Sequence, residues 1–362
     1  MKFAPTLALL AALSALAPAQ QKGKQPPPVL TECGAHGDLE IICGTRSPED
    51  LELTPDGKSL IVSQFTNARA AGAGLTLFDP AKKTYTLIPI SAEPLKDWGD
   101  ATCPGPIGEA LAPHGTSLVK RSNGKMQLFV VNHGGRQSIE MFELKQTAGA
   151  WGLVWHGCVV HMQGYNDVAA LPNGGFVATH PTALQAQGGQ GKAAPGQGND
   201  PFSGQPSGYV ASWTPGKGET ELPGTRAPYP NGVVAASDGR YIYFAAWTVR
   251  EVHKYDLKEG KEAGMVKLDF MPDNLTWTKK GRMLAAGVKG ARGDCPSGSG
   301  TPCVLGFGVA EIDPAKMTAT TVFDSEGKGP LISGVSVALQ MGNAVYIGAF
   351  QGDRLVKVAA KK

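Results

Sequence analysis

A glycine-containing turn followed by a strand-like run recurs six times along this chain of 362 residues. The turn glycines are Gly57, Gly124, Gly174, Gly239, Gly281 and Gly342. The residues after each turn are rich in apolar, β-branched and aromatic side chains, and a second strand-like segment follows each run. One such sheet leaves two apolar faces uncovered, so several sheets must stack to form a core. The pattern predicts an all-β fold, a six-bladed β-propeller with a central channel.

Two other observations favour the propeller. The 48 glycines and 27 prolines indicate many turns, and we find no convincing amphipathic helix longer than about two turns. A β-sandwich would also use many short strands, but it gives no reason for a turn that recurs six times. The net charge is +3 without a basic stripe, so nucleic acid is not an expected partner.

The N-terminus has the pattern of a processing segment. Lys2 is followed by an apolar run from Leu7 to Leu16 and by the small-residue site Ala17-Pro18-Ala19. We therefore predict a signal peptide over 1–19, a disordered lead-in over 20–30, and one propeller domain over 31–362. The expected location is secreted or periplasmic. The apolar run is too short to span a bilayer, and the alternative to cleavage is a retained anchor.

The chain has six cysteines and no CxxC motif, which disfavours a zinc ribbon. An even number in an exported chain suggests three disulfides, although six cysteines allow about 15 connectivities. We favour Cys295–Cys303 first and Cys33–Cys43 second, which leaves Cys103 with Cys158.

Polar residues occupy a shared position before these turns. The residue eight positions before the turn glycine is Glu49, Asn166, Asn231 or Asp273 in four units, and Asn274 follows Asp273. His114 lies ten positions before Gly124. The innermost strands of a propeller run along its axis, so these side chains should meet at one mouth of the channel. Carboxylate and amide oxygens in such a set suit Ca²⁺ better than Mg²⁺ or softer metals. Taken singly, each Asn or Asp could instead cap a turn, and the histidine could simply be packed.

Several segments resemble the paraoxonases in order and neighbourhood. They are EDLEL from Glu49, PHGTS from Pro113, LFVVNH from Leu128, IEMF from Ile139, NDV from Asn166, NGV from Asn231, and DN at Asp273. The paraoxonases are calcium-dependent lactonases and arylesterases, within a wider group of six-bladed propellers that includes gluconolactonases and strictosidine synthases. The resemblance runs from about residue 45 to the end and is most specific between Glu49 and Asp167.

The resemblance implies two calcium ions. A catalytic ion would take Glu49, Asn166, Asn231, Asp273 and Asn274, and a deeper structural ion would take Asp50, Asp167 and the backbone carbonyl of Thr116. His114 and His133 resemble the family's histidine dyad. The implied reaction is hydrolysis of a small-molecule lactone or ester, in which calcium stabilises the oxyanion, His114 is the general base and His133 orients it or relays its proton.

The chain also departs from the family. No cysteine follows Cys303, so the family's disulfide between the chain ends is not available. A Gly/Gln-rich segment over 185–208 replaces a membrane-seeking helix, and it is expected to be a flexible lid or loop. Because it has no apolar face, we expect no membrane anchor, and we expect a different substrate pocket. His180 lies in a changed context and is given no role.

Other functions stay open. A serine hydrolase is disfavoured because no GxSxG occurs. The alternatives are a sugar lactonase of the gluconolactonase type, a lyase of the strictosidine-synthase type that would need a catalytic glutamate, and a non-catalytic propeller that uses calcium only for stability.

Overall fold

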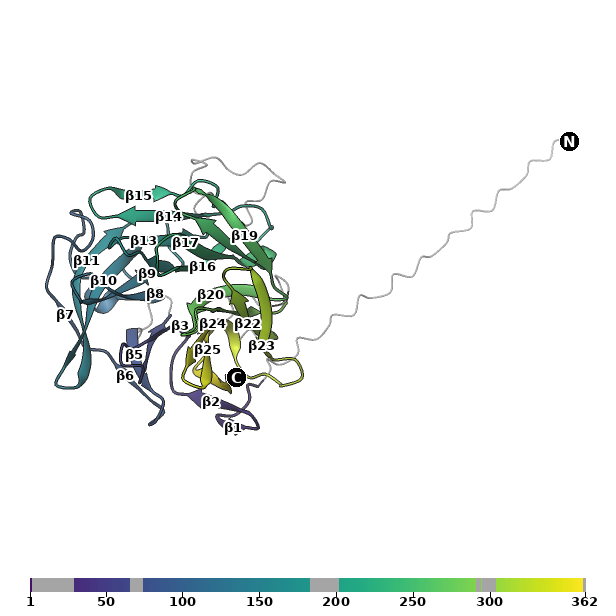
Figure 1. Ribbon diagram of the computed structural model, residues 1–362. Helices are drawn as coiled ribbons and strands as arrows, with labels where there is room; N and C mark the ends of the chain where they lie inside the picture. Colours follow the sequence, from purple (N-terminus) through teal and green to yellow (C-terminus); the bar gives the residue numbers. More distant parts are fainter. Residues whose placement is uncertain (2–28, 66–73, 183–201, 291–293, 295–303, 361–362) are drawn as a thin grey trace.

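The computed structural model describes Met1 and residues 29–65, 74–182, 202–290, 294 and 304–360. Six sheets stand around a central channel, which confirms the predicted all-β propeller (Figure 1). Residues 2–19 of the expected signal peptide, most of the 20–30 lead-in, most of the 185–208 segment, and both Cys295 and Cys303 lie outside the described residues. Within the described part of the chain, no helix is long and apolar enough to cross a membrane.

Each sheet is one blade, and its innermost strand is named first in the lists that follow. Blade 1 contains β3 (Pro48–Leu53), β4 (Leu60–Gln64), β5 (Gly74–Asp79) and β6 (Thr84–Leu87). Blade 2 contains β8 (Pro113–Lys120), β9 (Met126–Asn132), β10 (Ser138–Thr147), β11 (Ala150–Val160) and β7 (Ile90–Ala92), which runs parallel to β11. Blade 3 contains β12 (Val168–Ala170), β13 (Phe176–His180), β14 (Tyr209–Thr214) and β15 (Gly218–Glu221).

The other three blades follow the same order. Blade 4 contains β16 (Pro230–Ala235), β17 (Tyr241–Ala246), β18 (Glu251–Asp256) and β19 (Lys261–Lys267). Blade 5 contains β20 (Met271–Trp277), β21 (Met283–Val288), β22 (Phe307–Asp313) and β23 (Thr318–Asp324). Blade 6 contains β24 (Ser333–Met341), β25 (Ala344–Gln351), β26 (Arg354–Ala359), β2 (Leu39–Cys43) and β1 (Gly34–His36). Two short 3-10 helices, η1 (Gly108–Ala110) and η2 (Trp247–Val249), lie in connections.

The six turn glycines explain the repeat. Each one joins the innermost strand of a blade to the second strand, and each has a positive φ between 60° and 85°. That left-handed backbone is readily adopted by glycine, which has no Cβ to clash. The turns therefore all lie at the same end of the innermost strands, and the residues that begin these strands lie at the other end.

Apolar side chains fill the spaces between blades. Phe129 of blade 2 meets Phe176 of blade 3 with ring centroids 5.7 Å apart, and Phe176 stacks on Trp213 at 5.2 Å. All three side chains are fully buried. Aromatic burial of this kind holds adjacent blades together.

Blade 6 closes the ring because it is built from both ends of the described chain. β2 near the N-terminus pairs antiparallel with β26 at the C-terminus, from Leu39 opposite Val358 to Cys43 opposite Arg354. Strand pairing thus joins the ends where the paraoxonases use a disulfide. Two expected disulfides are present, Cys33–Cys43 and Cys103–Cys158.

Candidate metal and catalytic site

The oxygen-bearing residues predicted for the channel mouth come together. Glu49, Asn231 and Asp273 lie in the first half of β3, β16 and β20, and Asn166 lies two residues before β12. The amide nitrogen of Asn274 donates to Glu49 Oε1 at 2.7 Å and to the Glu49 carbonyl at 3.1 Å, which joins blade 5 to blade 1. The Asn231 side chain lies close enough to Asp273 to lower the pKa of that carboxyl, which partly opposes the effect of burial. Each of these five side chains is at most 7% exposed.

Four acceptor oxygens in this group have no hydrogen-bond partner although they are buried. They are Glu49 Oε2, Asn166 Oδ1, Asn231 Oδ1 and Asn274 Oδ1. Buried acceptors are nearly always paired, since an unpaired one costs about 1–3 kcal/mol. Four together, from four blades, therefore call for a positively charged partner. An all-oxygen set of carboxylates and amides fits a hard divalent cation.

The carboxylates beside these amides are crowded. Burial and the nearby Glu49 carboxylate raise the pKa of Asp273 well above its usual range. Burial and the charge of Asp50 do the same to the pKa of Asp167. A cation among these groups would relieve both effects, because it would supply the attraction that burial removes.

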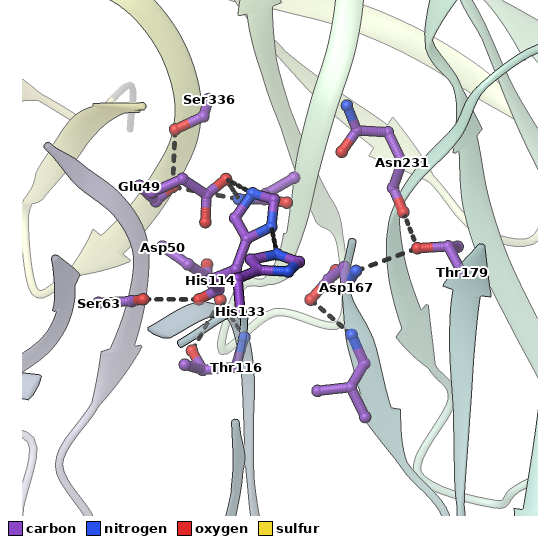
Figure 2. Close-up of polar contacts among 12 residues, drawn as sticks. Glu49, Asp50, Ser63, His114, Thr116, His133, Asp167, Thr179, Asn231 and Ser336 are labelled. Atoms are coloured by element: carbon purple, nitrogen blue, oxygen red, sulfur yellow. Dashed lines mark hydrogen bonds and ion pairs between the residues drawn. The ribbon is translucent and has the colours of Figure 1, made fainter. Parts of the chain in front are cut away.

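Asp50 and Asp167 lie deeper in the channel and bind the neighbouring blades. Asp50 Oδ2 accepts from the N–H and the hydroxyl of Thr116, each at 2.7 Å, and Asp167 Oδ2 accepts from the Val233 N–H at 2.7 Å (Figure 2). Burial and the Glu49 charge raise the pKa of Asp50 to about 7. Thr116 therefore contacts Asp50 through hydrogen bonds donated by its N–H and its hydroxyl, not through its carbonyl. The predicted role of its carbonyl in a second ion site stays a prediction.

A cavity of about 540 Å³ fills the channel between these two aspartates and the turn end. Glu52 lies in its wall and accepts from the Leu118 N–H at 2.9 Å. Burial and the charge of Asp50 raise the pKa of Glu52 to about 8. The two aspartates thus separate this cavity from the mouth that holds Glu49 and Asn231.

The two predicted histidines are in direct contact beside the oxygen group. His114 Nδ1 lies 2.9 Å from His133 Nε2, and His114 Nε2 lies 3.5 Å from Glu49 Oε1 (Figure 2). His133 Nδ1 is 2.6 Å from Gln137 Oε1. Burial, and then the charge of His114, lower the pKa of His133 to about 4, so His133 is neutral at neutral pH.

These contacts fix the protons on the dyad. Gln137 Oε1 only accepts, so His133 carries its proton on Nδ1 and presents a lone pair at Nε2. His114 must then donate from Nδ1, which leaves the lone pair of His114 Nε2 free beside Glu49. A neutral imidazole in this tautomer can accept a proton at Nε2, and the Glu49 carboxylate would stabilise the resulting cation.

The backbone feature that aims these side chains was not predicted from the sequence. In four blades the site residues lie at a β-bulge on the innermost strand, between Pro48 and Asp50, Pro113 and Thr116, Pro230 and Val233, and Pro272 and Leu275. A bulge re-aims a side chain, and proline is tolerated there because the ladder is already interrupted. The signal was present in the sequence as a proline one residue before Glu49, His114, Asn231 and Asp273.

Three supporting residues were also missed. Ser336 lies at a fifth bulge on β24 and donates to the Glu49 carbonyl at 2.6 Å (Figure 2). Phe65 covers the dyad, with its ring centroid 4.5 Å from that of His114. Gln137 orients His133, as described above. None of the three belongs to a repeated position in the sequence, so only the fold brings them to the site.

An aromatic group lies next to Asp273. Phe202 stacks on Tyr229 with ring centroids 5.0 Å apart, and Trp247 lies 5.7 Å from each. Burial, and then the charge of Asp273, raise the pKa of Tyr229 to about 12. All three rings are half-buried, so an apolar wall adjoins the polar mouth.

Comparisons with known proteins agree on the fold. No protein-family model matches the chain, and no curated protein matches it. A structural-genomics structure named as a proposed gluconolactonase superposes with a TM-score of 0.51 at 13% identity, covering 92% of this chain and 97% of that one. The luciferin-regenerating enzyme superposes with a TM-score of 0.51 at 12% identity, covering 89% and 95%. At these identities the likeness is one of fold, and it places the chain among propellers of that shape.

Proposed function

We propose that this protein is a calcium-dependent hydrolase of lactones or aryl esters. The observation that carries the proposal is the set of four unpartnered, buried oxygens of Glu49, Asn166, Asn231 and Asn274 beside the hydrogen-bonded histidine dyad. One fold neighbour is named as a proposed gluconolactonase, which is in keeping with the lactonase class.

Glu49, Asn166, Asn231, Asp273 and Asn274 would hold the calcium ion. When bound, the ion would supply a positive charge that stabilises the oxyanion developing on the substrate carbonyl. The chain's own contribution is to hold the ligand oxygens before the ion arrives. Asn274 does this through its two contacts with Glu49, and Ser336 does it through the Glu49 carbonyl.

His114 Nε2 would take the proton from the attacking water. His133 keeps the required tautomer of His114, because its own Nδ1 proton is committed to Gln137. The ring of Phe65 covers His114, whose side chain is 13% exposed, and so limits the access of bulk water to the base. The aromatic group of Phe202, Tyr229 and Trp247 would bind the apolar part of the substrate.

The test is hydrolysis of phenyl acetate, of a γ- or δ-lactone and of an aldonolactone by the purified protein, before and after calcium removal with EGTA. His114→Gln should lower the rate by about 10²–10⁴ while calcium binding is retained. Asp273→Ala should abolish calcium binding as well as activity. His36→Gln, which changes a partly exposed histidine in the β1–β2 hairpin, is the control and should change neither property.

The outcomes separate the alternatives. Hydrolysis that disappears with calcium and returns on its addition supports the proposal. Activity confined to the aldonolactone would identify a sugar lactonase. A folded, calcium-binding protein that hydrolyses none of the three substrates would refute the hydrolase and favour a propeller that uses calcium for stability.

A further inference from the structure

A second polar cluster lies outside the channel and shares no residue with it. His161 follows β11 of blade 2, while His180 ends β13 and Glu219 lies on β15 of blade 3. Among the described residues these three could hold a metal ion, since their ligand atoms all lie within 4.8 Å of one another. Glu219 Oε1 is 3.0 Å from His180 Nε2 and 3.6 Å from His161 Nε2. These two distances bracket the roughly 3.3 Å that separates two ligand atoms bonded to one tetrahedral Zn²⁺ at about 2.0–2.1 Å.

The protons on His180 point to a cation in this cluster. Its Nδ1 lies 3.2 Å from the Gly164 carbonyl, which only accepts, so Nδ1 carries a proton. Its Nε2 faces Glu219 Oε1, which is also an acceptor. A neutral His180 would set a lone pair against a carboxylate oxygen at 3.0 Å. Either a second proton or a metal ion must lie between them.

The groups that hydrogen-bond to these three side chains are of the kind that supports the ligands of a metal site. His161 Nδ1 lies 3.3 Å from the Gln163 carbonyl, so the tautomer with Nδ1–H leaves Nε2 free to bind a metal. The other tautomer of His161 accepts from the Gln163 N–H at 3.1 Å. Glu219 Oε2 accepts from the Tyr165 hydroxyl at 2.6 Å, which leaves Oε1 to face both imidazoles. Metal-binding histidines usually donate their second N–H to a carbonyl or carboxylate in this way.

We infer that His161, His180 and Glu219 bind a divalent transition-metal ion of the zinc class. Two imidazoles and one carboxylate form a ligand set typical of zinc sites with an open position, whereas Ca²⁺ prefers oxygens alone. The side chain of His180 is fully buried and that of His161 is 31% exposed, so an ion and a fourth, water ligand have access from the His161 side.

This site would fasten the connection between blades 2 and 3. Tyr165, which supports Glu219, directly precedes Asn166 and Asp167 in the channel. The N–H of His161 donates to the Gln137 carbonyl at 3.1 Å, and Gln137 orients His133. The inference goes beyond the proposed hydrolase, because its readout is binding of a second kind of metal and not hydrolysis.

The test uses the full chain, stripped with a chelator and then kept in excess calcium. Titration with Zn²⁺ by calorimetry should show one tight equivalent, and Co²⁺ should give the intense visible bands of a tetrahedral ion. Glu219→Gln and His161→Gln should weaken Zn²⁺ binding by more than about 100-fold, and Tyr165→Phe by about 10–100-fold, as expected for an outer-shell partner. His36→Gln should leave the affinity unchanged.

Three results would overturn the inference. One is the absence of a tight Zn²⁺ equivalent in the unmutated chain. Another is Zn²⁺ binding that survives both Glu219→Gln and His161→Gln. The last is a nitrogen NMR spectrum in which His180 is an imidazolium that does not respond to Zn²⁺, which would show that a proton alone occupies the cluster. Because the unmutated chain gives the first and third readouts, a variant that fails to fold does not prevent a decision.

Discussion

Removal of the proposed calcium ion should make the stability of this protein depend on pH through the channel carboxylates, and Asp50 is the most informative of them. Burial and the Glu49 charge raise the pKa of Asp50 from an ordinary value of 3.8 to about 7 when no cation is present. The folded state therefore binds the proton more tightly than the unfolded state. Between pH 3.8 and about 7, stability must fall as the pH rises.

The size of the effect follows from the same values. Each pH unit of difference between the folded and unfolded pKa corresponds to about 1.4 kcal/mol, so Asp50 alone accounts for roughly 4 kcal/mol between these limits. Asp167 and Asp273, whose pKa values are also raised, should add to the slope. Bound calcium should flatten it, because the ion takes the place of the protons.

Urea unfolding in EGTA at several pH values between 4 and 8 would measure this slope, with a parallel series in excess calcium. Asp50→Asn should reduce the total fall in unfolding free energy over this pH range by roughly 4 kcal/mol, because an amide does not titrate. Asp38→Asn, at an exposed position in the β1–β2 turn, is the matched control and should leave the slope unchanged. An EGTA series in which stability rises with pH, or a slope equal in Asp50→Asn and the unmutated chain, would show that the carboxylates are not crowded as described.

The lowered pKa of His133 means that the unfolded state takes up its proton first as the pH falls, so the free energy of unfolding should drop by up to roughly 3 kcal/mol between pH 6.5 and 4. His133→Gln in excess calcium should remove this loss, as measured by urea unfolding. Equal acid sensitivity in the variant would contradict the assignment. Gly115→Ala would place a Cβ 2.2 Å from Asp167 Oδ1 and 2.6 Å from its Cα. We therefore expect the free energy of unfolding to fall by about 1–3 kcal/mol and calcium binding, measured by calorimetry, to weaken. A variant with unchanged stability and calcium affinity would refute the contact. Replacing both Cys103 and Cys158 by serine opens a loop of 55 residues and should lower the thermal midpoint. The loss in the free energy of unfolding from chain entropy is at most about 4 kcal/mol. A midpoint within error of that of the unmutated chain would show that packing already holds the loop.

The fold was predictable because its signal is local and repeated. Gly57 and its five counterparts each specify one turn, and counting back eight residues from four of them reaches Glu49, Asn166, Asn231 and Asp273. This count works because the distance from the site residue to the turn glycine is the same in these four blades, although the innermost strands themselves differ in length. The propeller then brings the counted positions together without any long-range information from the sequence.

Counting residues from the turn glycines does not predict every contact in the site. The contact between His114 and His133 depends on the register of β8 and β9, where Pro113 lies opposite Asn132 after a bulge. Counting outward from the turn at Gly124 would have made the two histidines near neighbours, but a bulge shifts such a count by one residue. The cluster at Glu219 depends on where the 161–167 connection crosses from one blade to the next, which no local pattern specifies.

The shared last blade has a consequence for the order of assembly. Glu49 is among the first residues of the propeller to be synthesised, while β26, which must pair with β2 to complete the circle, is among the last. The ring therefore cannot close before β26 has been synthesised, and the early and late residues proposed as calcium ligands stay apart until then. Loading of the proposed calcium ion would then follow closure of the ring. A circular permutant that joins the two ends and opens elsewhere would allow that order to be changed.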